Sequence, residues 1–94
     1  MGITVCKEMK TLRKYLDDNG IQWWDDSSIS SLFWMVRTKF HHNGREFSVI
    51  NGVGSYGGCV DANGKNGGLL ECMIDGREPI GHLTAKEVIE KIER

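Results

Sequence analysis

The dipeptide Asn43-Gly44, set between two runs of alternating apolar and polar residues, constrains the fold more than any other feature of the chain. Both residues tolerate the positive φ angles of a two-residue type I′ turn, so residues 32–53 are predicted to form a β-hairpin. A two-residue loop also fixes the register, which places Phe40 opposite Phe47 and Trp34 opposite Val53. The face predicted to be the core carries Trp34, Val36, Thr38, Phe40, Phe47, Val49 and Val53.

The opposite face of this hairpin is polar near the turn and apolar near its base. It carries Phe33, Met35, Arg37, Lys39, His41, Glu46, Ser48 and Ile50, with His41 opposite Glu46. A contiguous apolar patch is normally covered, so a helix, the long loop that follows the hairpin, or a second copy of the chain is expected over the base. We predict a homodimer through Phe33, Met35 and Ile50.

Two segments carry helical signals. Apolar residues recur at i, i+4, i+7 and i+11 from Val5 to Leu16, which predicts a helix from about Thr4 to Asp18. Gly20 is expected to adopt the left-handed conformation that ends such a helix, with Ile21 packing back on Leu16. Near the other end of the chain, residues 84–87 have the spacing of a capping box.

The capping box, formed by Thr84 and Glu87, predicts a final helix from Ala85 to about Glu93, with buried positions at Val88, Ile89 and Ile92 and a contact between Leu83 and Val88. Residues 69–74 alternate as a third strand, and Asp75-Gly76 is a second tight-turn signal. Pro79 lacks an amide donor, so any fourth strand after it must be brief or lie at an edge.

The chain of 94 residues is too short for two cores and is predicted to be a single domain, 1–94. Its expected fold class is α+β, with an antiparallel sheet of three or four strands between an N-terminal and a C-terminal helix.

Charge and composition narrow the possible partners. Twelve Lys and Arg against 13 Asp and Glu give a net charge of −1, which removes the electrostatic case for non-specific binding to nucleic acid. No run approaches the roughly 18 apolar residues of a membrane span, and no secretory signal is visible, so a cytoplasmic protein without a membrane contact is expected.

Cysteine and histidine offer no recognisable metal or redox site. Cys6, Cys59 and Cys72 lack the paired spacing of zinc ligands, and we interpret them as free thiols. His41 and His42 are neighbours on a strand, so their side chains point to opposite faces. The acidic pairs Asp17-Asp18 and Asp25-Asp26 are expected to diverge in the same way. We therefore predict no metal, no cofactor and no enzymatic activity.

Residues 51–68 hold seven of the 12 glycines. Residues 52–57 match G-x-G-x-x-G, but no helix or parallel strand unit is expected to follow, so the context argues against a dinucleotide site. Residues 61–72 resemble the start of a calcium loop but lack the glycine and the final acid that it needs. Two interpretations remain: a connector made of tight turns, or a ligand loop whose backbone amides hold a phosphate.

Candidate contact residues lie on the hairpin and on this glycine-rich loop. They are Arg37, Lys39, Arg45, Gly54, Ser55, Tyr56, Gly57, Gly58 and Lys65. The cations would suit a phosphate or an acidic protein surface. The alternative is that they form a solvated sheet face that serves solubility and edge protection. The roles of Trp23 and Trp24 are also open: each is either a core residue or a contact for a partner.

Three segments resemble a set of short, uncharacterised proteins of phages and prophages of Gram-positive bacteria. They are residues 47–58 (FSVINGVGSYGG), 68–71 (GLLE) and 83–88 (LTAKEV). The resemblance includes no catalytic motif. It implies an accessory protein that binds and modulates a host protein, including proteins of host defence systems. The second hypothesis is a protein that binds or sequesters a nucleotide or cyclic nucleotide through the glycine-rich loop.

Overall fold

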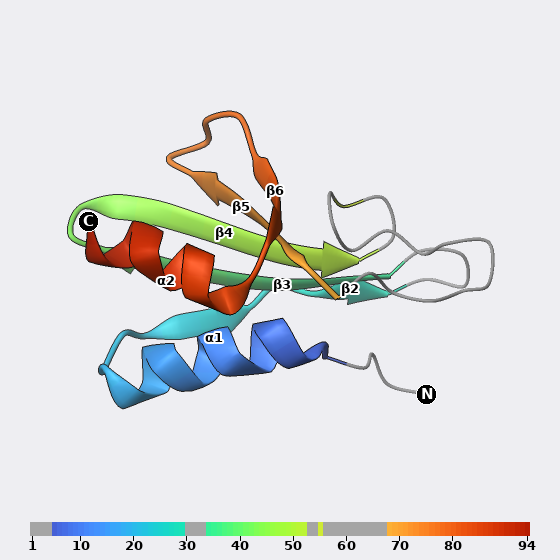
Figure 1. Ribbon diagram of the computed structural model, residues 1–94, viewed down its shortest axis with the longest axis horizontal. Coiled ribbons are helices and arrows are strands. Elements are labelled where there is room, and N and C mark those ends of the chain that lie inside the picture. Colours follow the sequence, from blue (N-terminus) through green and yellow to red (C-terminus); the bar gives the residue numbers. More distant parts are fainter. Residues whose placement is uncertain (1–4, 30–33, 53–54, 56–67) are drawn as a thin grey trace.

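One antiparallel sheet and two helices make up the fold of the computed structural model, which describes residues 5–29, 34–52, 55 and 68–94 (Figure 1). The elements are α1 (Lys7–Asp18), β1 (Trp23–Asp25), β2 (Ser28–Ile29), β3 (Trp34–His42), β4 (Arg45–Gly52), β5 (Leu70–Ile74), β6 (Ile80–Leu83) and α2 (Ala85–Glu93). The sheet order is β1-β3-β4-β5-β6, and β2 also pairs with β3. The predicted α+β class is confirmed, and the sheet is wider than the three or four strands expected.

The hairpin formed by β3 and β4 has the predicted turn and register. Asn43 and Gly44 have φ angles of 51° and 75°, as a type I′ turn requires. Phe40 lies opposite Phe47, and their rings stack with centroids 4.8 Å apart. His41 lies opposite Glu46 as expected. The predicted partner of Trp34, Val53, lies outside the described residues.

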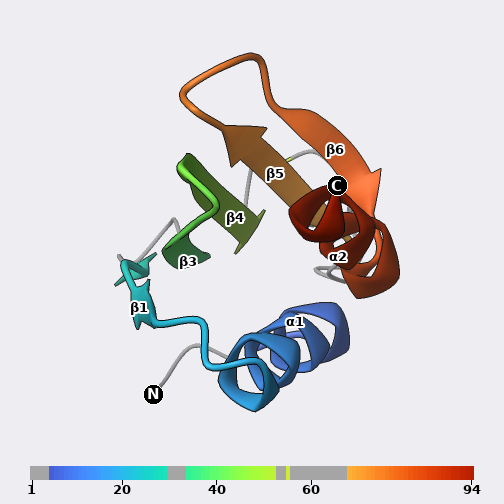
Figure 2. The same cartoon turned by 90° about the vertical axis from the view of Figure 1, so that its left-hand side faces the viewer.

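Both helices lie on the same side of the sheet, which curves around them (Figure 2). We call the side that faces the helices the inner face and the other side the outer face. The predicted core face is confirmed as the inner face where it is described, and Trp34 is half-buried at its margin. Its fully buried side chains on the hairpin are Val36, Thr38, Phe40, Phe47, Val49 and Asn51. The buried helical residues packed on them are Met9, Leu12, Leu16, Ala85, Val88 and Ile92.

Two polar side chains in this core have hydrogen-bond partners. The hydroxyl of Thr38 donates to the sulfur of Met9 at 3.2 Å and accepts from Nε of Arg13 at 2.8 Å. The amide of Asn51 donates to the carbonyl of Leu69 at 2.9 Å. These bonds offset the cost of burying the polar groups, which is large when no partner is present.

Helix α1 begins at Lys7, three residues after the predicted Thr4, which lies outside the described residues. Cys6 has extended backbone angles and occupies the N-cap position, so Val5 contacts the core from outside the helix. The predicted C-terminal ending is confirmed. Gly20 has a φ angle of 67°, and the Ile21 amide donates to the Leu16 carbonyl at 2.8 Å, as in a Schellman motif.

Helix α2 has the predicted bounds and the predicted capping box. The Thr84 hydroxyl accepts from the Glu87 amide, and the Glu87 carboxylate accepts from the Thr84 amide. The hydrogen bonds that this carboxylate accepts from the Thr84 amide and from the Thr84 hydroxyl lower the pKa of the Glu87 carboxyl. Leu83 and Val88 are both buried in the core, whereas Ile89 is half-buried against it.

The strands β1 and β2 were not predicted from the sequence. Trp23, Trp24 and Asp25 pair with Phe40, Lys39 and Thr38, so the extended segment gains backbone hydrogen bonds along β3. Trp23 packs against the core, whereas Trp24 is 44% exposed. The structure thus separates the two tryptophans into a core residue and a surface residue.

At the other edge, β5 and β6 are joined by the predicted turn, in which Asp75 and Gly76 have φ angles of 54° and 70°. β6 follows Pro79 and is the last strand of the sheet order, as the missing amide of that proline led us to expect. Its pairing with β5 is irregular between Leu70 and Cys72, and His82 has a φ angle of 59°. This irregularity interrupts regular pairing at the exposed edge.

We expect Gly52→Ala to destabilise the fold by about 1–3 kcal/mol, because a Cβ there would lie 2.5 Å from the Trp34 carbonyl oxygen and 2.7 Å from the Met35 Cα. Gly44→Asn is the matched control in the same hairpin, where no atom lies within 4 Å and asparagine tolerates the positive φ. Its cost should stay below about 1 kcal/mol. Urea denaturation measures the free energy of unfolding of both variants. Equal losses of stability would show that the close approach of β3 and β4 at Gly52 is wrong.

Removing the α2 cap with Thr84→Ala should lower the free energy of unfolding at pH 7 by about 1 kcal/mol. The Glu87 carboxyl has a lowered folded pKa, so its contribution is complete above its ordinary value of 4.5 and is lost as the pH falls through the folded value. Thr84→Ala keeps the amide bond that lowers this pKa most, but it removes the second cause, the hydrogen bond from the Thr84 hydroxyl to the Glu87 carboxylate. Urea titrations at pH 7 and pH 3 should therefore show a smaller gap between variant and parent at pH 3. A constant gap would contradict the capping box.

Candidate functional site

The outer face of the sheet carries a row of half-buried side chains that no described helix covers (Figure 2). The register brings Arg37 opposite Ile50, Lys39 opposite Ser48, and Ser48 opposite Met73 of β5. Met35 lies at the base of the same face on β3. Because the turn fixes which side chains alternate outward, this mixture of apolar and cationic groups follows directly from the hairpin register.

Arg37 and Lys39 come together on the outer face, and both lie beside Asp26. The Arg37 Nη1 is 3.3 Å from the Asp26 carboxylate, and the Lys39 Nζ is 4.0 Å from it. The segment before β2 is held in place by two further bonds, from the Asp26 amide to the Arg37 carbonyl and from the Arg37 amide to the Ser27 hydroxyl, each 3.0 Å long. One carboxylate thus serves two cations.

The Arg37 guanidinium is incompletely satisfied. Its Nη2 contacts the sulfur of Met35 at 3.5 Å, which is a weak acceptor. Its Nε is buried and has no hydrogen-bond partner among the described residues. A buried donor without an acceptor costs on the order of 1–3 kcal/mol of stability. A stronger acceptor placed beside the Arg37 guanidinium would therefore lower its free energy.

The neighbouring acid Asp25 faces the other way, as expected for adjacent residues of an extended chain. Its carboxylate accepts from the Ser27 amide at 2.9 Å and lies 3.6 Å from Arg13 of α1. The hydrogen bond from Ser27 and the charge of Arg13 lower the pKa of the Asp25 carboxyl. Asp25 and Asp26 therefore serve different faces of the sheet and do not form a two-acid site.

Arg45 does not join Arg37 and Lys39, which corrects the predicted grouping of the three cations. It lies on the inner face, where its Nη2 donates to the carbonyls of Ile92 at 3.0 Å and Arg94 at 3.2 Å. Its guanidinium also lies 5.1 Å from the centre of the Phe47 ring. A cation at this position satisfies carbonyls that a helix C-terminus leaves unpaired.

Ser55 is buried, and its hydroxyl is used within the chain. It accepts from the Gly52 amide at 3.0 Å and donates to the Gly52 carbonyl at 2.8 Å, so it closes a local turn and does not reach outward for a ligand. The other predicted contact residues of the glycine-rich loop lie outside the described residues. They are Gly54, Tyr56, Gly57, Gly58 and Lys65.

The described cysteines are free thiols, as predicted, and Cys59 lies outside the described residues. Burial raises the pKa of the Cys72 thiol to about 11, so it is protonated at neutral pH and a poor nucleophile. Within residues 5–29, 34–52, 55 and 68–94, no three His, Cys, Asp or Glu side chains are grouped so that they would hold a metal ion. The helices of the same ranges are all too short or too polar to span a bilayer.

The contacts of Arg45 predict a structural role that is separate from the outer face. Arg45→Ala should lower the free energy of unfolding by about 1–2 kcal/mol, because it leaves the last carbonyls of α2 without their donor. Lys39→Ala is the matched control on the neighbouring strand and should change stability by less than about 0.5 kcal/mol. Urea denaturation compares the free energies of unfolding of the two variants. Equal values would contradict the structural role of Arg45.

Comparisons with known protein families, with curated proteins and with solved structures find no match to this chain. The interpretation of the site therefore depends on its own geometry. Among the described residues, that geometry offers a mixed apolar and cationic outer face with one unsatisfied guanidinium.

Proposed function

We propose that this protein is a non-enzymatic binding module that docks its outer face on an acidic surface of a partner protein. In line with the phage resemblance of its sequence, we further propose that the chain is an accessory protein of a phage or mobile element. Its partner would then be a protein of the bacterial host, and a host defence protein is the kind of target that such accessory proteins have.

The observation that carries the proposal is the state of Arg37. Within the part of the chain that the structure describes, its Nε is buried without an acceptor, and its Nη2 contacts only a thioether sulfur. A carboxylate from a partner can accept two hydrogen bonds from one guanidinium, and such charge-assisted pairs are about twice as strong as neutral ones. Among the described residues, the free protein thus leaves a guanidinium donor without an acceptor, and a partner acid satisfies it once the Arg37 side chain rearranges.

The surroundings of Arg37 match the composition of protein interfaces. Met35 and Ile50 provide half-buried apolar contact area beside the cation, and arginine and methionine are enriched at interface cores. Trp24 extends the face along β1, where its ring lies 5.5 Å from that of His41. Tryptophan and arginine, here both on one face of the sheet, are among the residue types most often found to dominate binding energy.

The local charge around Arg37 and Lys39 favours an acidic partner. Arg37 and Lys39 share the carboxylate of Asp26, at 3.3 and 4.0 Å, so these three residues together carry one net positive charge. The acids Glu46 and Glu71 lie on the same face, opposite His41 and Ile50. Lys39 is 30% exposed and Arg37 35%, so both remain reachable from solvent. A partner acid placed between them would complete the pairing, whereas a basic surface would be repelled.

The proposal is tested by affinity capture from a lysate of the bacterial host, with quantitative mass spectrometry. Lys39→Glu and Arg37→Ala should each reduce recovery of the specific partner about tenfold or more, because both remove a cation from the contact. Lys86→Glu is the matched control, since Lys86 is an exposed cation of α2, on the other side of the sheet. It should leave recovery unchanged.

Two results would overturn the proposal. One is a partner recovered equally with all four forms of the protein, which would place the contact elsewhere. The other is sedimentation of the purified parent as a dimer that Lys39→Glu converts to a monomer, because a second copy would then occupy the outer face. The predicted homodimer involves Met35 and Ile50 on this face, together with Phe33, which lies outside the described residues.

A further inference from the structure

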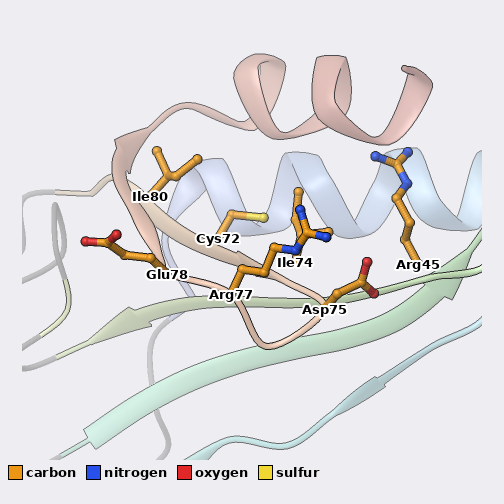
Figure 3. A pocket seen from close by; sticks show the side chains of 7 residues that line it. All are labelled: Arg45, Cys72, Ile74, Asp75, Arg77, Glu78 and Ile80. Atoms are coloured by element: carbon orange, nitrogen blue, oxygen red, sulfur yellow. The ribbon is translucent and has the colours of Figure 1, made fainter.

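A pocket of about 500 Å³ lies where the turn between β5 and β6 meets the start of β4, away from the outer face (Figure 3). Its lining residues are Arg45, Cys72, Ile74, Asp75, Arg77, Glu78 and Ile80. We propose that this pocket binds a small organic anion with an aliphatic body. The site is independent of the proposed protein contact, because it shares no residue with the outer face.

The floor of the pocket is apolar. Cys72 is buried, Ile74 is half-buried, and both side chains belong to the inner face of β5. Ile80 of β6 is 49% exposed, which makes it the most exposed large apolar side chain in the described part of the protein. A single exposed isoleucine is ordinary on a protein surface, but Ile80 continues an apolar surface that begins at Ile74 and Cys72. The exposed area of Ile80 therefore forms part of the pocket wall.

Two arginines provide the positive charge. Figure 3 shows the side chains of Arg45 and Arg77 both turned toward α2. Arg45 is held by the last carbonyls of that helix and by the Phe47 ring, so its position is fixed before any ligand arrives. Arg77 has no hydrogen bond or ion pair from its side chain to the described residues, and its guanidinium remains available.

The two acids of the lining do not neutralise these arginines. Asp75 accepts a hydrogen bond from the Glu46 amide at 2.8 Å, which ties its carboxylate to the start of β4. The Glu78 carboxylate points away from both guanidinium groups in Figure 3. Within the described residues, neither acid lies within 4.0 Å of a charged nitrogen of either arginine. The Cys72 thiol is protonated at neutral pH and adds no negative charge.

This arrangement defines the chemistry of the ligand. Guanidinium groups bind carboxylates and phosphates, which accept paired hydrogen bonds from their planar donors. The apolar floor favours a hydrocarbon body beside the anionic group. The seven lining residues include no aromatic ring, so stacking on a nucleobase has no support here. The pocket therefore fits an aliphatic carboxylate or an alkyl phosphate.

The test is a titration followed by ¹⁵N NMR, with hexanoate and hexyl phosphate as probes. Each combines an anionic group with a short apolar body, whereas hexanol lacks the charge and inorganic phosphate lacks the body. We expect saturable shifts centred on Ile74, Arg77 and Ile80 with one or both anionic probes. Hexanol and inorganic phosphate should bind about tenfold more weakly. The tighter of the two anionic probes identifies the carboxylate or the phosphate as the preferred group.

Substitutions in and away from the pocket show where the probes bind. Arg77→Gln and Ile80→Ser change exposed side chains and should each weaken binding of the better probe about tenfold. Lys39→Gln and Trp24→Ser are matched controls on the outer face, a cation and an exposed apolar residue, and should leave the affinity unchanged. Shifts that do not saturate, hexanol binding as tightly as the anions, or an equal effect of the outer-face variants would each overturn the assignment.

Discussion

The tight reversal at Asn43-Gly44 determines which side chains of this protein meet the helices and which do not. With two residues in the loop, eight residue pairs follow in fixed order from His42–Arg45 to Met35–Gly52. Side chains alternate between faces along each strand, so this one turn sends Phe40, Phe47 and Arg45 inward and Lys39 outward. A slip of one residue would bury the cation and expose the stacked rings. The burial of those rings therefore stabilises the register, and the register places every candidate contact on the hairpin.

Features that depend on neighbouring residues in the chain were predictable from the sequence. The ending of α1 at Gly20, the capping box of α2 and both tight turns each depend on local backbone geometry and on a residue that tolerates it. The starts of elements were less predictable. Residue 5 fits the apolar period of α1, yet the backbone is extended at Cys6, because an apolar contact does not require the residue to lie within the helix. β1 was missed because three residues carry too little periodicity, and their pairing with β3 is a non-local interaction.

The sites were harder to predict than the fold for the same reason. The sequence grouped Arg37, Lys39 and Arg45 as cations of one hairpin, but nothing local to the hairpin shows that Asp26 lies beside the first two. The partners of Arg45 are carbonyls at residues 92 and 94, almost fifty positions away. Alternation along β4 was the available signal, since Arg45 and Phe47 share a face two residues apart. The pocket beside Arg45 had no sequence signal, because its lining comes from three strands and a turn.

The difference between Arg37 and Arg45 explains why we propose different ligands for the two surfaces. Arg45 is held by two carbonyls and an aromatic ring, so little conformational entropy is lost when an anion binds beside it. A small ligand offers few contacts and depends on such preorganisation. Arg37 has a buried donor for which the described residues supply no acceptor, and its ion pair with Asp26 is partly exposed. Moving the Arg37 side chain out of this arrangement costs free energy, which a large interface can offset. The same movement lets the Arg37 guanidinium gain the acceptor that it lacks. The inner-face arginine is thus suited to a small anion, and the outer-face arginine to the acidic surface of a protein.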